Sequence, residues 1–404
     1  MNKIENLKQK IKLKDETLEK YKEMKRNLEK SNNKVDEDIL LKCKKKKKKK
    51  QLWNFNFDNL RLSSKSYQTF KGPYGLSFNN GQFICSGSDD NTFRVWDVEN
   101  TTQIQSFSEC STPIDCVKFS SYHYYNHYRT AICSSINKTI CFWNIKTKKQ
   151  LRKLNGHTGR IYNFGFSRFN CGRYLCSGSG DRTICLWDVE TSKSLHVFNG
   201  HTSGVCCVEF SPLQSYNNND NNKGNNMGVI GGNGYTICSG SYDNTIRIWD
   251  IETSKQSIVF EGHEQSINSV KYGSNELGII GGANTILSGS SDCSVRLWDI
   301  RSNQKIQIFD GHTSDVNVVE YSPFVVNDSE VGGSGNVICS GSSDSTIRFW
   351  DIRSDKELHV IDASGSGIYC LTFLPLKKKK KAKSKDHKLN LCYGSFEGLV
   401  FAWE

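Results

Sequence analysis

Histidine, serine and aspartate recur together four times in this chain of 404 residues. In each set a serine follows the histidine after 20 to 38 residues, an aspartate comes four residues later, and a tryptophan six residues after that. These residue types suggest nucleophilic catalysis by a Ser–His–Asp triad. Because an enzyme needs one site rather than four, we expect a structural role. The sets are His157/Ser177/Asp181/Trp187, His201/Ser239/Asp243/Trp249, His263/Ser288/Asp292/Trp298 and His312/Ser340/Asp344/Trp350.

The sequence around these sets is itself a repeat. Seven short runs of alternating apolar residues end in Trp followed by Asp, Asn or Glu, and successive tryptophans lie 44 to 62 residues apart. Self-similarity of this length is typical of a β-propeller built from four-stranded blades. The seven tryptophans are Trp96, Trp143, Trp187, Trp249, Trp298, Trp350 and Trp403.

Each repeat contains the signals for four strands, which we call a, b, c and d in chain order. The stretch CSGSDDNTFRVWD at Cys85–Asp97 has a polar turn between two alternating apolar segments, which predicts a hairpin of strands b and c. Strand a lies upstream and ends in an aromatic residue such as Phe210. Strand d lies downstream, as in Ser194–Phe198.

Four repeats carry Gly-His just before strand a, at Gly156, Gly200, Gly262 and Gly311. With these pairs and the Trp-Asp ends, residues 66–404 resemble the WD40-repeat family. The resemblance implies that the His, Ser, Asp and Trp of each set form one hydrogen-bonded tetrad that ties strands a, b and c together. It also implies an all-β fold, a seven-bladed WD40 propeller, preceded by a helical or disordered N-terminal extension.

Three blades depart from the tetrad pattern. Blade 1 keeps Ser86, Asp90 and Trp96 but has Pro73-Tyr74 in place of Gly-His, and blade 2 lacks the aspartate. Blade 7 has Tyr393 and Glu397 at the Ser and Asp positions. Because blades 7, 1 and 2 are neighbours in a closed ring, we expect this side to open first on heating.

Closure of the ring is predicted from the two ends of the propeller. The sequence stops just after strand c of blade 7, and a d-type segment without a blade of its own stands at 66–71. We expect this segment to be the outer strand of blade 7, which removes two free strand edges. The expected organisation is a coiled-coil helix at 1–35, a lysine-rich and aromatic linker at 36–65, and the propeller at 66–404.

The cysteines predict packing rather than chemistry. Six of the sixteen precede the strand-b position of the tetrad serine, and Leu287 occupies the same place in a seventh repeat, which marks them as small core residues. No Cys-x-x-Cys occurs, so we expect no metal and no cofactor. Unpaired thiols and an N-terminus without a signal peptide predict a cytoplasmic or nuclear protein. The six are Cys85, Cys133, Cys176, Cys238, Cys339 and Cys392.

Positive charge is concentrated in two lysine runs. The net charge is +12, and removing the sixteen lysines at 42–50 and 377–388 leaves −4 for all other residues. The propeller itself is therefore not a basic surface. The runs have three interpretations: low-complexity drift without function, a nuclear-import signal, or a patch that docks an anionic partner such as RNA, an acidic protein or a membrane. Binding of an anionic partner would weaken with salt. Representative positions are Lys44, Lys47, Lys50, Lys377, Lys380 and Lys383.

The N-terminal 4–30 segment has a short heptad pattern of apolar residues, including Ile4, Leu7 and Ile11. It predicts either a solvated marginal helix, or a disordered tail, or a helix that pairs with a helical partner. An N-terminal heptad helix before a seven-bladed propeller also resembles heterotrimeric G-protein β subunits, in architecture only.

The long insertions all fall between strands a and b, and their Asn/Gly composition predicts disorder on the bottom face. The d–a and b–c turns form the opposite, top face and stay short. The resemblance points to partner-binding residues beside the turn aspartate and after Gly-His, with Tyr242 the first choice because exposed aromatics anchor partners. The others are Asp89, Gly180, Ser291, Ser343, Arg160, Ser203, Gln265 and Asp315.

We therefore predict a non-catalytic scaffold or adaptor subunit of a multiprotein complex, which docks proteins or peptide segments on the top face and has no small-molecule substrate. Two alternatives stay open. One is a G-protein-β-like signalling subunit that pairs through its N-terminal helix. The other is a nuclear assembly or chromatin-complex subunit whose lysine clusters hold RNA or acidic partners.

Overall fold

A computed structural model describes most of the propeller region. The described residues are 53–54, 65–68, 73–79, 83–97, 102–108, 110–127, 130–167, 170–212, 236–273, 284–328, 333–363, 366–375, 389–396 and 399–403. The chain divides into two compact units, 1–50 and 51–404, and all described residues belong to the second. The predicted helix at 1–35, most of the linker at 36–65 and both lysine runs lie outside the described residues.

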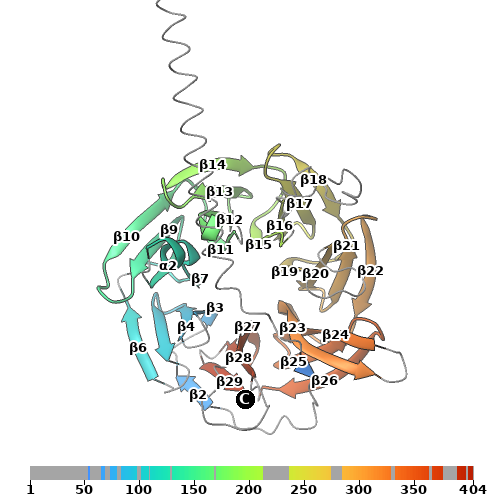
Figure 1. The fold of residues 1–404 in the computed structure, drawn as a ribbon. Helices are drawn as coiled ribbons and strands as arrows, with labels where there is room; N and C mark the ends of the chain where they lie inside the picture. Colours follow the sequence, from blue (N-terminus) through green and yellow to red (C-terminus); the bar gives the residue numbers. More distant parts are fainter. Residues whose placement is uncertain are drawn as a thin grey trace, which may run out of the picture. The chain divides into compact units, whose positions relative to one another are not determined.

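The described strands form an all-β propeller, as predicted, with seven sheets placed around a common centre (Figure 1). Six sheets have four strands, and the seventh has five because one short strand is added to it. Blades 1 to 3 consist of β3 (Pro73–Asn79), β4 (Phe83–Ser88), β5 (Phe93–Asp97) and β6 (Thr102–Phe107); β7 (Val117–Phe119), β8 (Ala131–Ile136), β9 (Thr139–Asn144) and β10 (Gln150–Asn155); and β11 (Ile161–Phe166), β12 (Tyr174–Ser179), β13 (Ile184–Asp188) and β14 (Lys193–Phe198).

The remaining blades follow the same order from the centre outwards. Blade 4 has β15 (Val205–Phe210), β16 (Thr236–Ser241), β17 (Ile246–Asp250) and β18 (Gln256–Phe260), and blade 5 has β19 (Ile267–Tyr272), β20 (Thr285–Ser290), β21 (Val295–Asp299) and β22 (Gln304–Phe309). Blade 6 has β23 (Val316–Asp328), β24 (Gly333–Ser342), β25 (Thr346–Asp351) and β26 (Lys356–Asp362). Blade 7 has β27 (Ile368–Pro375), β28 (Leu389–Ser395), β29 (Leu399–Trp403) and β2 (Lys65–Gln68).

The hydrophobic core lies between neighbouring blades. One cluster joins Ile184 and Phe198 of blade 3 to Val205 and Trp249 of blade 4. The contact repeats around the ring, since the strand-c tryptophan packs on the strand-d phenylalanine of the preceding blade, with ring centroids 5.4 to 6.0 Å apart in four pairs. The blades approach closely because strand b has a glycine there: a Cβ added at Gly240 would lie 2.5 Å from Ile267 of the next blade.

The outer strand of blade 7 comes from the N-terminal side of the propeller. Strand β2 pairs antiparallel with β29, with Lys65 opposite Ala402 and Gln68 opposite Leu399. The sheet that contains the last three strands of the chain therefore also contains residues that precede blade 1. This pairing covers the edge that β29 would otherwise present to other chains.

Two insertions that we expected to be disordered have regular structure, so the expectation is wrong for them. The segment after β7 forms helix α2 (Ser121–His127), whose Tyr122 and His123 are buried. In blade 6, β23 and β24 continue as a paired hairpin, with Asp328 opposite Gly333. Asn/Gly-rich composition does not prevent a ladder from extending beyond the sheet when two strands already run side by side.

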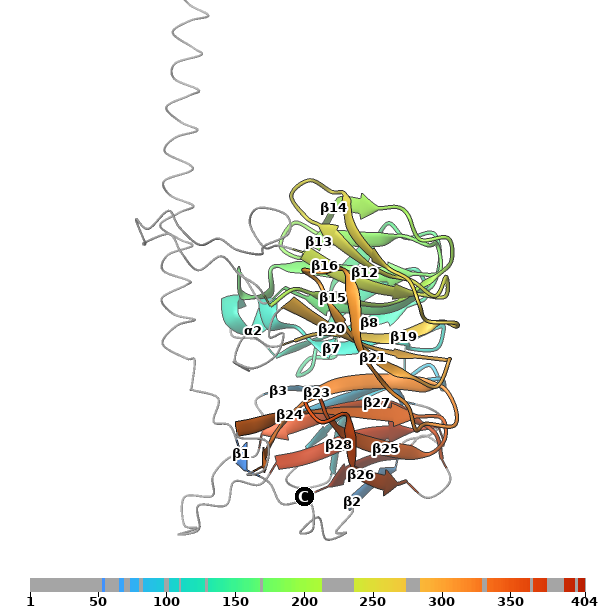
Figure 2. The same ribbon diagram turned by 90° about the vertical axis from the view of Figure 1, so that its right-hand side faces the viewer.

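One part of the predicted linker is a strand. Strand β1 (Trp53–Asn54) pairs in parallel with β23, opposite Phe324 and Val325. It adds the fifth strand to the sheet of blade 6. Helix α2 and β1 lie on the same side of the ring, the bottom face, at the left in Figure 2.

Deletion of residues 51–72 tests how much β2 stabilises the ring. Because blade 7 would lose its outer strand, we expect the midpoint of thermal unfolding to fall by about 5 °C or more. The control is deletion of residues 1–60, which also removes β1 but leaves β2 in place. An unchanged midpoint in the 51–72 deletion, measured by circular dichroism, would show that β2 contributes nothing to stability.

Candidate functional site: the buried tetrads and the channel mouth

The structure brings together the four residues of each predicted tetrad. The histidine Nδ1 lies 2.7 to 2.9 Å from the aspartate, and Nε2 lies 2.8 Å from the serine hydroxyl. The tryptophan Nε1–H donates to the same hydroxyl at 2.8 to 2.9 Å. The glycine before the histidine leaves room for the indole, since a Cβ added at Gly156 would lie 2.8 Å from the Trp187 ring.

These sets have the connectivity of a catalytic triad but not its accessibility. The serines Ser177, Ser239, Ser288 and Ser340 are completely buried, and each hydroxyl is already an acceptor for an indole N–H. A nucleophile must reach the substrate, and these hydroxyls do not reach the surface. Each tetrad instead satisfies the buried polar atoms of three strands at once.

In three tetrads the electrostatics fit a neutral imidazole beside a carboxylate. Burial lowers the pKa of His201, His263 and His312, although the hydrogen bond to the aspartate opposes this shift. Burial would raise the pKa of Asp344, but hydrogen bonds from Thr346, His312 and the backbone N–H of Thr313 lower it to about 2. The aspartate is therefore ionised over the whole physiological range.

Two of the three atypical blades retain part of the network. Trp96 donates to Ser86 at 3.0 Å in blade 1, and Trp143 donates to Ser134 at 3.1 Å in blade 2. Asp90 has no histidine and pairs with Arg94 at 2.7 Å. In blade 7 Tyr393 occupies the serine position and is buried.

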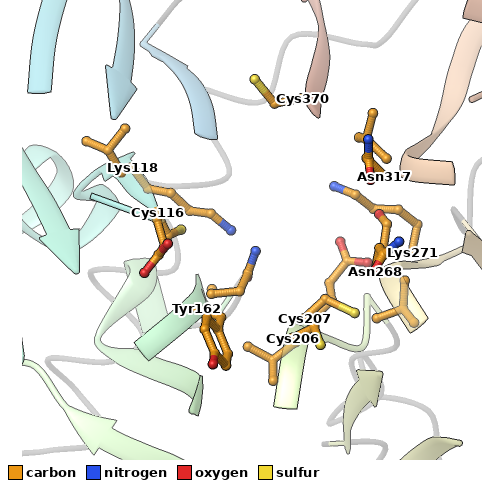
Figure 3. A pocket seen from close by; sticks show the side chains of 18 of the residues that line it. Cys116, Lys118, Tyr162, Cys206, Cys207, Asn268, Lys271, Asn317 and Cys370 are labelled. Atoms are coloured by element: carbon orange, nitrogen blue, oxygen red, sulfur yellow. The ribbon is translucent and has the colours of Figure 1, made fainter. Parts of the chain in front are cut away.

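The innermost strands surround a central cavity of about 670 Å³. Figure 3 shows Lys118 and Tyr162 on one wall and Asn268, Lys271 and Asn317 on the opposite wall. Lys271 forms an ion pair with Glu320 at 2.9 Å. The cavity is therefore polar and contains both signs of charge.

The residues at the top of this channel are placed by a β-bulge that recurs in strand a. Between strands a and b the register skips one residue in six blades, and that residue has no partner on strand b. Bulges re-aim side chains out of the ladder. The described side chains at this position are Tyr162, Cys206, Asn268, Asn317 and Tyr369, and all five line the cavity.

Two aromatic pairs stand at the mouth. Tyr242 is 46% exposed and its ring meets that of Tyr162 edge-on, with centroids 5.7 Å apart. Phe396 is 61% exposed and stacks on Tyr369 at 5.6 Å. Both exposed rings belong to b–c turns, where Tyr242 and Phe396 donate equivalent backbone hydrogen bonds to Gly204 and Gly367.

The other predicted partner-binding residues divide into three groups. Asp89, Gly180, Gln265 and Asp315 are exposed. The side chains of Arg160, Ser291 and Ser343 are engaged: Arg160 makes a two-bond ion pair with Asp115 at 2.6 and 2.7 Å, and the two serine hydroxyls accept hydrogen bonds from Asn268 and Asn317. Ser203 is half-buried and its carbonyl accepts from Ser241.

Sequence analysis missed Phe396 and the bulge residues. Phe396 stands in blade 7 where Tyr242 stands in blade 4, so alignment of all seven turns would have found it. The bulge residues directly follow the apolar residue that begins strand a, as Tyr162 follows Ile161. That position reads as an ordinary strand residue, because a bulge leaves no signal in the alternating pattern.

The cysteines have no arrangement suited to chemistry in the described ranges. The fifteen described cysteines are not in disulfides, and those before the tetrad serine are fully or almost fully buried. Burial raises the pKa of Cys176 to about 12, so it is a thiol at neutral pH. The described residues contain no group of three or more metal-ligating side chains. They also contain no helix long and apolar enough to cross a bilayer.

Comparison with known proteins identifies the repeats of blades 4 to 6. Residues 192–250, 254–299 and 303–351 match the family described as WD domain, G-beta repeat. The chain therefore contains WD40 repeats. Each matched WD40 repeat starts near strand d of one blade and ends with strand c of the next, so repeat and blade are offset by one strand. In blade 7 the strand-d position, next to β29, is occupied by β2, which precedes blade 1 in the sequence.

Two further similarities extend beyond these three WD40 repeats. Residues 4–198 match the second β-propeller of WD repeat-containing protein 75. The chain is also 26% identical over 340 residues to Protein tipD of Dictyostelium discoideum, covering 81% of this chain and 48% of that protein. The chain thus spans about half the length of this relative.

Replacement of Ser340 by alanine tests the contribution of a tetrad to the WD40 propeller. Because His312 and Trp350 lose their shared partner inside the protein, we expect the free energy of unfolding to fall by about 1–3 kcal/mol. Denaturant titration measures the change. The control is Ser257→Ala on the exposed face of β18, and equal stability of the two variants would contradict the role of the tetrad.

Three of the buried tetrad histidines, His201, His263 and His312, predict acid sensitivity. Their pKa values are lower in the folded protein than the ordinary value of 6.5, so the unfolded chain binds more protons below that pH. We expect the thermal midpoint to fall as the pH is lowered through 6.5, and to fall again below about 4 as Asp344 becomes protonated in the unfolded chain. A constant midpoint between pH 7.5 and 4 would contradict this prediction.

Proposed function

We propose that this WD40 propeller is a non-catalytic scaffold that docks protein segments on its top face, across the mouth of the central channel. Propellers of this family generally serve as protein-interaction scaffolds. The observation that carries the finer proposal is the pair of exposed rings, Tyr242 and Phe396, each held by a second ring at the edge of the cavity. Rigid, partly exposed aromatics at a pocket are typical hot spots of binding.

The tetrads support this function because they fix the surface in advance. In each tetrad the aspartate of the b–c turn accepts a backbone hydrogen bond from the d–a loop, which fixes four of these loops against the turns. Because the loops are already ordered, binding of a partner requires little further loss of conformational entropy. Fifteen described cysteines outside disulfides fit our proposal of a cytoplasmic or nuclear location. Pairing through the N-terminal helix and anionic docking through the lysine runs stay predictions, because those segments lie outside the described residues.

Affinity capture with the full chain tests the docking face. In the double variant Tyr242→Ala/Phe396→Ala we expect the recovery of bound proteins to fall at least about thirtyfold, the loss of a typical hot spot. The matched control is Leu195→Ala/Val197→Ala on β14, where both side chains are similarly exposed but lie on the outer circumference. Quantitative mass spectrometry compares the two. Partners that are retained equally by both variants would exclude the top mouth as the docking site.

A further inference from the structure

Charge on the top face is divided unequally around the ring. Apart from the tetrads and the Asp90–Arg94 pair, the described d–a and b–c turns contain six acidic and three basic residues. All three basic residues belong to the turns of blades 2 and 3, whereas four of the acidic ones precede blades 5 and 6. The basic residues are Lys138, Arg160 and Arg182, and the acidic ones are Asp89, Asp115, Glu261, Glu264, Asp310 and Asp315.

The two sides of the mouth differ in how this charge is compensated. Asp115 is held by Arg160 through two hydrogen bonds. Asp315, at the start of blade 6, is exposed and forms no ion pair with any described residue. The described turns that precede blades 5 and 6 therefore have a net negative charge, which attracts a cationic ligand.

Two asparagines add hydrogen-bond acceptors on the same side. The Asn317 amide donates to the Ser343 hydroxyl and to the Ile368 carbonyl, both at 2.9 Å. Asn268 repeats this arrangement one blade earlier, with Ser291 and Val316 as its partners. Because both N–H groups of each amide are used, the Oδ1 atoms are left as acceptors, and neither accepts a hydrogen bond from a described residue.

An aromatic surface completes this side of the mouth. Tyr369 lies one blade beyond Asn317, and the exposed ring of Phe396 stacks on it. Burial raises the pKa of the Tyr369 hydroxyl, and the nearby carboxylates of Asp315 and Asp89 raise it further. Carboxylate, amide oxygens and aromatic faces thus converge at blades 6 and 7.

We infer that the docked segment is basic and places an arginine side chain at this side of the mouth, against Asp315, Asn317 and the Tyr369–Phe396 pair. This inference rests on the proposed function and specifies the partner's chemistry. A guanidinium group has five N–H donors in one plane and stacks on aromatic rings, which fits a site of acceptors beside an aromatic face. A lysine ammonium is more strongly hydrated and has fewer donors, so arginine is the better match.

Selection from a random 12-residue peptide display library, with the full chain as bait, tests this inference. We expect the selected peptides to share one arginine, and replacement of that arginine by glutamine to weaken binding at least about tenfold. Asp315→Asn should weaken the same peptides by about tenfold, while Asp310→Asn, an exposed carboxylate in the same d–a loop, should change affinity less than about twofold. Fluorescence anisotropy with labelled peptides measures both ratios.

Several outcomes would overturn the inference. They are selected peptides without a basic residue, equal effects of the Asp315 and Asp310 variants, or no selected peptide at all. Peptides that lack arginine but lose affinity in Tyr242→Ala/Phe396→Ala would overturn the arginine site while leaving the docking face intact. Lysine-rich peptides whose affinity does not depend on an arginine would also count against the inference.

Discussion

A buried indole N–H needs an acceptor, and in six of the blades a serine hydroxyl supplies it. The tryptophan fills the space between blades, so it has to be buried, and its single polar atom would otherwise destabilise the core. The serine on strand b satisfies that atom. In four blades it also donates its own hydroxyl hydrogen to Nε2 of the histidine before strand a, because Nδ1 carries the proton that faces the aspartate. The need for an acceptor at the buried indole N–H therefore links the packing between blades to the position of the d–a loops on the top face.

Much of the architecture follows from the sequence because each blade solves this same problem. The spacing of four residues from Ser to Asp and six from Asp to Trp is set by a tight turn and a two-stranded ladder, so it survives in the residue pattern. The tetrads could be named in advance for that reason. Tyr242 could also be named, because it is an aromatic residue at a turn position where blades 1, 3, 5 and 6 have Asp, Gly or Ser.

The features that sequence analysis missed depend on geometry rather than on residue type. A bulge changes which face a side chain occupies without changing the alternation of apolar residues, so the direction of Asn268, Asn317 and Tyr369 was not predictable. Helix α2 and the long hairpin of blade 6 were missed for a related reason. Composition indicates only an average tendency of a segment to be disordered. The neighbouring strands fix both ends of an insertion, which lowers the conformational entropy lost when the insertion becomes ordered.

The recurring bulge gives the ring a series of equivalent positions that face the channel, where the backbone is the same in each blade and the side chain differs. The skipped residue has no partner on strand b, and among the described blades it is tyrosine, cysteine or asparagine with the same backbone around it. The same backbone therefore accepts three different types of side chain. Descendants of a duplicated gene could thus acquire new ligands one sector at a time, and the same sites are natural starting points for engineering a binder.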